Sequence, residues 1–427
     1  MSRYDTIVIG AGLAGLTTAC HLAQAEKKVL LLAHGLGALL LASGCIDILG
    51  YQPADSLDPV KNPLSQLDAF LAERPNHPYH ISGQAHIKAG LDAFKRLVNS
   101  NSLDYQGSLD RNWLLPSTVG AVRPTCLAPA SLANGELSRG GNMLIVGFNE
   151  LRDFYPALIS RNINEQKLGV ESDAVTLSLP PIPLANAMNV TPIELARSFE
   201  EPDFRHGVAN SIKPKSKDFD RIGFPAVLGI QSHAEVMADL EKKLGKTIFE
   251  ISTLPPSVPG RRLFEGLRQA FVQAGGQIII GSKVVDGAIE NGQVTQVRFE
   301  TANRLKIVQA KSYVLATGGI YGGGIQTDAD GGIGKVWEPI FGLPVEAESN
   351  RHLWFATGFL DPKGQPFANY GVNVDKNLKP VNGSGNPIAG NLYVAGATLA
   401  GSDWTRGRTG DGVAIATAAT IVKQIIG

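Results

Sequence analysis

A glycine-rich turn near the start of the chain constrains its fold more than any other feature. An apolar run at residues 6–9 leads directly into Gly10-x-Gly12-x-x-Gly15, and apolar residues then recur at helical spacing. A second apolar run follows at residues 28–33. A strand, a glycine turn, a helix and a strand within about 30 residues are typical of one βαβ unit. The sequence therefore predicts an α/β chain that opens with a nucleotide-binding unit of the Rossmann type.

Each glycine of this turn has a predicted role. Gly10 permits the tight turn, Gly12 lets a phosphate approach the backbone, and Gly15 allows the helix to pack closely on the strand. Leu13 and Ala14 begin the helix, where free N–H groups and a partial positive charge favour an anion. A turn kept only for packing is the alternative to this nucleotide site.

The end of the second strand lacks the carboxylate that usually accepts hydrogen bonds from an adenosine ribose. Ala33 and His34 stand there, and no Asp or Glu occurs at residues 27–46. No Arg fills the gap either, so a 2′-phosphate has no partner except His34. FMN has one phosphate and no adenosine, whereas FAD would need backbone groups near Val284 to hold its adenosine. The missing acid therefore favours FMN, with FAD as the alternative.

Later segments contain small residues suited to contact the same cofactor. The run "VLATGG" is a strand that ends in Thr and two glycines, and "LYVAGA" repeats this pattern. The helix after "GRTGDG" begins with glycines that could face a flavin. The candidate residues are Ser43, Gly44, Thr317, Gly318, Gly319, Gly396, Asp411, Gly412 and Val413.

The pattern along the chain predicts two domains. We assign residues 1–50, 260–335 and 389–427 to a discontinuous nucleotide-binding domain that includes a β-meander. Residues 51–259 and 336–388 lose the βαβ rhythm, and we assign them to an inserted α+β cap or substrate domain.

Composition excludes several classes of function. Lys+Arg and Asp+Glu are balanced at 39 each, so nucleic acid is not an expected partner. The three cysteines form no CxxC pair, so we expect no metal site, and no apolar run is long enough to span a bilayer.

Several stretches together resemble a known family of flavoproteins. These are "IVIGAGLAGLTTACHL", "SGCIDIL", "NWLLPSTVGAVRPTCLAP", "MLIVGFNELRDFYP", "LPPSVPGRRL" and "GRTGDGVAIATA". The chain resembles glutathione-reductase-type flavoproteins in the branch with fumarate reductase and succinate dehydrogenase. Within that branch it is most similar to the B subunits of anaerobic glycerol-3-phosphate dehydrogenases.

This resemblance implies a membrane-associated complex with a catalytic FAD subunit and an iron–sulfur subunit. The complex oxidises sn-glycerol 3-phosphate to dihydroxyacetone phosphate and passes electrons to the quinone pool, with this subunit peripheral on the cytoplasmic face of the inner membrane. The resemblance also implies FMN as the cofactor. An assembly subunit with little flavin and an independent FAD-dependent oxidoreductase of the fumarate reductase type are the alternatives.

Such a reaction needs cations for the substrate phosphate and a base for the hydroxyl proton. The candidate cations are Arg261, Arg262, Arg406 and Arg408, which could equally be surface or interdomain groups. No catalytic residue is identified, because the histidines are isolated in the sequence. We therefore expect that the isolated chain does not oxidise glycerol 3-phosphate.

Overall fold

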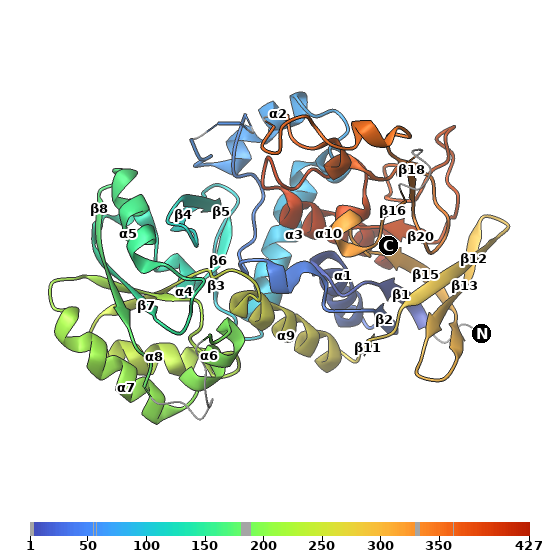
Figure 1. Ribbon diagram of the computed structural model, residues 1–427. Helices are drawn as coiled ribbons and strands as arrows, with labels where there is room; N and C mark the ends of the chain where they lie inside the picture. Colours follow the sequence, from blue (N-terminus) through green and yellow to red (C-terminus); the bar gives the residue numbers. More distant parts are fainter. Residues whose placement is uncertain (1–3, 54, 57, 181–188, 329–333, 362) are drawn as a thin grey trace.

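The chain folds into two lobes, each built on its own parallel sheet and its own buried core (Figure 1). The computed structural model describes residues 4–53, 55–56, 58–180, 189–328, 334–361 and 363–427. Among these residues, no helix has the length and apolar character needed to cross a bilayer.

The first lobe contains a five-stranded sheet in the order β11-β2-β1-β15-β20. Its strands are β1 (Tyr4–Ile9), β2 (Val29–Ala33), β11 (Gln277–Ile280), β15 (Ala310–Leu315) and β20 (Leu392–Val394). All neighbouring strands are parallel. β1 and β2 are almost wholly buried because helices cover the sheet, which explains their continuous apolar sequences. The predicted Rossmann-type α/β fold is confirmed.

Helices far apart in sequence cover this sheet. α1 (Leu13–Gln24) packs against α9 (Val258–Gln273) and α10 (Gly410–Ile426), and α10 also contacts α3 (Tyr79–Asn99). The Cys20 thiol donates a hydrogen bond to the Leu267 carbonyl at 3.3 Å, so this cysteine is part of the core between α1 and α9.

An antiparallel meander extends from the first lobe. It consists of β12 (Val284–Glu290), β13 (Gln293–Glu300) and β14 (Leu305–Val308). Asn291 and Gly292 join the first two strands with φ values of 52° and 71°, as a tight hairpin turn of this kind requires. The meander is therefore where the sequence predicts it.

The second lobe contains a four-stranded sheet in the order β10-β9-β7-β8. Its strands are β7 (Gly141–Phe148), β8 (Val170–Leu177), β9 (Arg221–Pro225) and β10 (Thr247–Ile251). All three pairings are parallel, so this lobe is α/β and not the expected α+β. The expectation failed because two successive helices separate β8 from β9 and hide the repeating order in the sequence.

The helices of the second lobe are α5 (Pro156–Glu165), α6 (Pro192–Phe199), α7 (Pro202–Ile212) and α8 (His233–Leu244). Phe199 lies at the centre of its core, with edge-on rings of Phe204 and Phe224 at centroid distances of 5.2 and 6.3 Å. This aromatic cluster is separate from the core of the first lobe.

Shorter elements complete the chain. They are α2 (Pro63–Ala72), α4 (Ala130–Ala133), β3 (Tyr105–Gly107), β4 (Trp113–Pro116), β5 (Val122–Thr125), β6 (Leu127–Pro129), β16 (Gln326–Asp328), β17 (Lys335–Trp337), β18 (Val345–Glu346) and β19 (Gly371–Val372). Phe70 of α2, Phe94 of α3 and Val372 of β19 belong to the core of the first lobe, although the sequence analysis assigned their segments to the cap.

Candidate functional site

The predicted cofactor residues gather at the carboxyl edge of the first sheet. Gly10 follows β1, His34 follows β2, Thr317 lies just beyond β15, and Gly396 lies just beyond β20. Parallel strands end at the same edge, and in open α/β sheets ligands bind at that edge. The fold thus brings together segments that are separated by several hundred residues.

The three glycines of the first turn differ in what surrounds them. A Cβ atom on Gly10 would lie 2.2 Å from the Ala316 carbonyl oxygen, and one on Gly15 would lie 2.0 Å from the Gly10 carbonyl oxygen. A Cβ on Gly12 would meet nothing within 4 Å. Gly10 and Gly15 are therefore needed for close packing, whereas Gly12 leaves open space beside the backbone.

The first turn of α1 adds free donors to this space. Gly12 is its N-cap and provides no side-chain hydrogen bond, and no acidic residue occurs in the turn. The N–H groups of a first helical turn have no partner within the helix, so those of Leu13 and Ala14 are suited to an anion. The residues present fit a phosphate group.

The end of β2 offers no carboxylate. The Ala33 side chain is buried, and its carbonyl accepts a hydrogen bond from the Ser282 N–H at 3.1 Å. His34 is exposed. Val284 begins the meander just beyond Ser282, which places backbone groups of β12 near the end of β2.

Backbone segments approach one another closely on the other side of the turn. The Gly318 N–H donates to the Thr398 hydroxyl at 3.0 Å, and a Cβ on Gly396 would lie 2.9 Å from the Ala14 Cβ. A Cβ on Gly319 would lie 2.9 Å from the Ala397 carbonyl oxygen. The Thr317 hydroxyl is buried and lacks a hydrogen-bond partner among the described residues, so it is available to a ligand.

The segment that follows β2 is held by side chains of the first lobe. The Ser43 hydroxyl accepts a hydrogen bond from the Cys45 N–H at 3.2 Å, and the Tyr105 hydroxyl donates to the Gly44 carbonyl. Burial raises the pKa of the Cys45 thiol to about 11. Cys45 is thus a protonated, buried thiol at neutral pH and is not a nucleophile.

The start of α10 contacts this segment directly. The Gly412 N–H donates to the Asp47 carbonyl at 3.0 Å, and the Asp47 N–H donates to the Asp411 carboxylate at 3.2 Å. A Cβ on Gly412 would lie 1.8 Å from the Tyr79 hydroxyl oxygen, and Val413 is fully buried. Of the three predicted residues of α10, only Asp411 has a partly exposed side chain.

Two arginines and two carboxylates form a charge cluster at this place. Arg123 pairs with the Asp47 carboxylate at 2.8 Å, and Arg408 lies 3.9 Å from the same group. Within the described part of the chain, the Asp47 Oδ1 and the Arg123 Nε atoms are buried and have no hydrogen-bond partner. Burial and the neighbouring Asp47 raise the pKa of Asp411 to about 7.

This cluster contains two charged residues that the sequence analysis did not name as candidates, Asp47 and Arg123. Asp47 and Arg123 occur in "SGCIDIL" and "NWLLPSTVGAVRPTCLAP", two of the stretches that carry the resemblance. Their approach to Asp411 depends on tertiary structure, because 364 residues separate Asp47 from Asp411. In the sequence, the presence of Asp47 and Arg123 in these stretches was the signal that could have identified them.

The four predicted substrate arginines do not form one site. Arg262 is buried, and its guanidinium donates to both oxygens of Glu250 at 2.6 and 2.9 Å. Arg406 lies on the loop before α10 beside Asp403, and Arg408 belongs to the charge cluster. Arg261 alone lines a pocket between the lobes.

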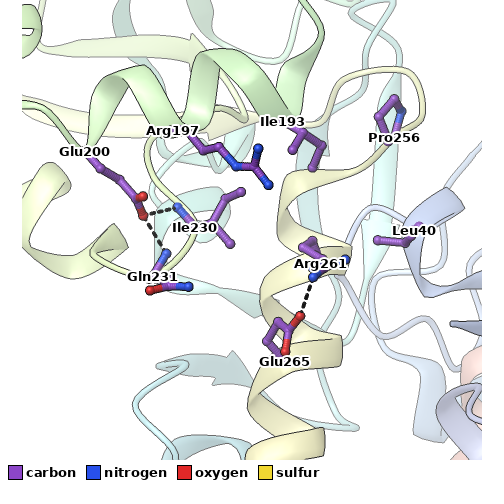
Figure 2. A pocket seen from close by; sticks show the side chains of 9 residues that line it. All are labelled: Leu40, Ile193, Arg197, Glu200, Ile230, Gln231, Pro256, Arg261 and Glu265. Atoms are coloured by element: carbon purple, nitrogen blue, oxygen red, sulfur yellow. Dashed lines mark hydrogen bonds and ion pairs between the residues drawn. The ribbon is translucent and has the colours of Figure 1, made fainter. Parts of the chain in front are cut away.

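That interlobe pocket has a volume of about 170 Å³ (Figure 2). One wall comes from the short 3₁₀ helix η1 (Gly37–Leu41) and from the start of α9. The opposite wall comes from α6 and the loop after β9. The lining residues are Leu40, Ile193, Arg197, Glu200, Ile230, Gln231, Pro256, Arg261 and Glu265.

Metal ligands do not gather in the described residues, where no group of three or more His, Cys, Asp or Glu side chains could hold an ion. The three cysteines are buried and free.

Comparison with known proteins identifies the family. Residues 5–413 match the model of a family described as FAD binding domain. The B subunit of the anaerobic glycerol-3-phosphate dehydrogenase of Pectobacterium carotovorum is 32% identical over 99% of each chain. A probable B subunit of the same enzyme from Halobacterium salinarum is 34% identical over 97% of this chain and 95% of the relative.

Two solved structures are more distant. An E. coli quinol fumarate reductase variant aligns with a TM-score of 0.44 at 10% identity, covering 99% of this chain and 70% of the other. The open conformation of a flavocytochrome c3 fumarate reductase aligns with a TM-score of 0.46 at 10% identity, covering 99% and 78%.

The matching family is described by FAD and not by FMN, so it supports FAD, which the sequence analysis treated as the alternative. Both the family match and the similarity to the dehydrogenase relatives extend over nearly the whole chain. The chain belongs to the FAD-binding domain family and, within it, to the family of B subunits of anaerobic glycerol-3-phosphate dehydrogenases.

Proposed function

We propose that this chain is the flavin-containing subunit of an anaerobic glycerol-3-phosphate dehydrogenase complex. The complex oxidises sn-glycerol 3-phosphate to dihydroxyacetone phosphate and passes the electrons to quinone. The main support for a bound flavin is the open space beside Gly12, where the first turn of α1 presents free N–H donors at the carboxyl edge of the sheet. Similarity to the dehydrogenase relatives along nearly the whole chain supports the substrate.

FAD is the proposed cofactor. Gly12, Leu13 and Ala14 would hold a phosphate, and the backbone near Val284 would hold the adenosine that lacks a carboxylate partner at Ala33. When bound, the flavin would supply an acceptor for two electrons that arrive from the catalytic subunit.

The proposed partners are a catalytic FAD subunit and an iron–sulfur subunit, with this subunit peripheral on the cytoplasmic face of the inner membrane. The relatives are named as B subunits, which supports an enzyme of several subunits. The three cysteines of this chain are buried and dispersed, so the cluster ligands of such an enzyme would come from another chain.

Within this chain, the charge cluster can bind and release a proton. One oxygen of Asp411 lies 3.2 Å from the Asp47 N–H, and the nearby Asp47 carboxylate disfavours a second negative charge. Arg123 pairs with the Asp47 carboxylate at 2.8 Å and keeps it beside Asp411. Asp411 is therefore the carboxyl group of this cluster that favours the protonated form.

Anaerobic reduction of the flavin tests this function. Glycerol 3-phosphate should leave the visible flavin band of the isolated chain unchanged and should bleach it once the two other subunits are added. Bleaching of the isolated chain would favour an independent oxidoreductase. Full quinone-linked activity of a complex that contains flavin-free Gly12→Val protein would favour an assembly role.

A further inference from the structure

The interlobe pocket contains two cations that come from different lobes. Arg197 lies in the last turn of α6, and Arg261 lies in the first turns of α9. Figure 2 shows the Arg197 side chain extending from α6 toward the side of the pocket formed by α9. The arrangement places two guanidinium groups at one small cavity between domains, a common location for ligand sites.

These guanidinium groups are incompletely neutralised. The side chain of Arg197 makes no hydrogen bond or ion pair with the residues that the structure describes. Arg261 pairs with Glu265 at 2.5 Å, but Glu265 also accepts from Arg268 at 2.8 Å. One carboxylate therefore serves two guanidinium groups on α9.

The other acid of the pocket is committed to the backbone. One oxygen of Glu200 accepts hydrogen bonds from the N–H groups of residues 230, 231 and 232 at 2.9, 2.6 and 3.1 Å. Burial alone would raise the pKa of Glu200, but these N–H groups outweigh it and lower the pKa. Glu200 is therefore ionised and held by the backbone, and it forms no ion pair with Arg197 among the described residues.

A further carboxylate, Glu194, lies three residues before Arg197 and closes the capping box of α6. Its oxygens accept from the Thr191 N–H at 2.9 Å and from the Thr191 hydroxyl at 2.8 Å. Arg197 acts on Glu194 only at longer range, as a minor contribution to its lowered pKa. Among the described residues, Arg197 thus has no ion-pair partner, and Arg261 shares its carboxylate with Arg268.

We infer that the interlobe pocket binds the phosphate group of a small phosphate monoester, with Arg197 and Arg261 as its two cationic ligands. Guanidinium groups match the geometry of phosphate oxygens and form strong charge-assisted hydrogen bonds with them. Leu40, Ile193 and Ile230 supply apolar surface for a short carbon chain. The pocket alone supports recognition of a phosphate group. The choice of glycerol as the rest of the ligand depends on the proposed function.

Equilibrium binding to the full chain tests this site. We would titrate the protein with glycerol 3-phosphate, inorganic phosphate and glycerol by calorimetry. Glycerol 3-phosphate should bind, inorganic phosphate should bind more weakly, and glycerol should not bind. Binding of glycerol, or no binding of either phosphate compound, would contradict an anion site. Equal affinity for the two phosphate compounds would contradict recognition of the ester as a whole.

Two variants locate the site and one serves as the control. Arg197→Ala and Arg261→Ala should each weaken binding of glycerol 3-phosphate by about tenfold or more, as expected for the loss of a charge-assisted hydrogen bond. Arg161→Ala removes the same charge from a matching i,i+4 pair with Glu165, outside the residues that line the pocket, and should bind normally. Unchanged affinity in both pocket variants would contradict the inference.

Two further variants test whether a loss of binding comes from misfolding or from loss of the flavin. Arg261→Lys retains the charge and should bind between the wild type and Arg261→Ala, with an unchanged circular dichroism spectrum. Flavin-free Gly12→Val protein should bind glycerol 3-phosphate as the wild type does. Loss of phosphate binding in this protein would contradict a site that is independent of the flavin, whereas retained binding in a wild-type chain that holds no flavin would leave this site standing and contradict the proposed function.

Discussion

The two parallel sheets have similar topology but opposite chemistry at their carboxyl edges. In each, the first strand lies between the second strand and a later one, as β1 lies between β2 and β15 and as β7 lies between β8 and β9. β1 is followed by a glycine turn with open space at Gly12. β7 is followed by Asn149 and Glu150 and then by buried Leu151. The two sheets thus offer equivalent places at their carboxyl edges, and the residues after the first strand decide which edge can admit a flavin.

At the carboxyl edge of the second sheet, carboxylates of the chain accept hydrogen bonds from backbone N–H groups. At the corresponding edge of the first sheet, the N–H donors of α1 have no such acceptor. Glu200 occupies three backbone N–H groups after β9, and Glu250 at the end of β10 is enclosed by Arg262, Ser131 and the Leu228 N–H. The carboxylates of Glu200 and Glu250 therefore already accept hydrogen bonds from the donors at this edge. We interpret the first edge as the flavin site because its donors have been left without such partners.

Gly12→Val is the change expected to have the largest effect, because it fills the space beside the first turn of α1. The φ of Gly12 is −76°, which any residue adopts, so the protein should fold. Flavin content measured by visible absorbance should fall more than tenfold. Gly35→Val is the matched control, since a Cβ at that position also meets nothing within 4 Å. Equal flavin content in both variants would contradict a flavin site beside Gly12.

Arg262→Ala tests the opposite edge. It should lower the free energy of unfolding by about 3–5 kcal/mol, because it leaves Glu250 buried without its cation. Arg261→Ala, one residue away, should cost less than about 1 kcal/mol because its ion pair is partly exposed. Urea denaturation measures both, and similar losses would show that the buried pair does not hold the second lobe together.

The pH dependence of stability sharpens the contrast between the two edges. Burial opposes ionisation of Glu250, but Arg262 and His233 hold its pKa at about 2. A lowered pKa contributes stability above the ordinary Glu value of 4.5, and this contribution is lost as the pH falls toward 2. Denaturation at pH 5 and pH 3 should show a large loss for wild type and a smaller one for Arg262→Ala. Parallel losses would contradict the assigned cause.

Asp411→Asn should produce an effect of opposite sign. The pKa of Asp411 is raised from 3.8 to about 7, so the protonated form favours the folded state. Its contribution is complete below pH 3.8 and is lost as the pH rises through 7. Wild-type stability should therefore decline from pH 5 to pH 8 relative to Asp411→Asn. Asp403→Asn, on the loop before α10, is the control and should follow the wild type.

How much could be predicted from the sequence differs between the two edges. The glycine turn and the meander depend on short local signals, namely glycine spacing and an Asn-Gly turn, and both were predicted. The parallel sheet of the second lobe was missed because long helical connections separate β8 from β9. The Asp47–Asp411 contact and the Arg197–Arg261 pocket join residues distant in sequence, and periodicity carries no information about such contacts.

The preference for FMN rested on one missing residue, and the family match does not support it. Ala33 does lack a carboxylate, as the sequence indicated, yet the chain belongs to a family of FAD-binding domains. Backbone donors and acceptors can replace a side chain, and they leave no trace in the sequence. The region around Val284 is where we expect that replacement.

The central claim is that the carboxyl edge of the first sheet holds a flavin at the open position beside Gly12. Mass spectrometry of the cofactor released by heat from the purified chain tests it most directly. We expect FAD, bound noncovalently at one molecule per chain in the wild type and absent from Gly12→Val protein. A wild-type chain that contains no flavin, and takes up neither FAD nor FMN on reconstitution, would contradict this claim.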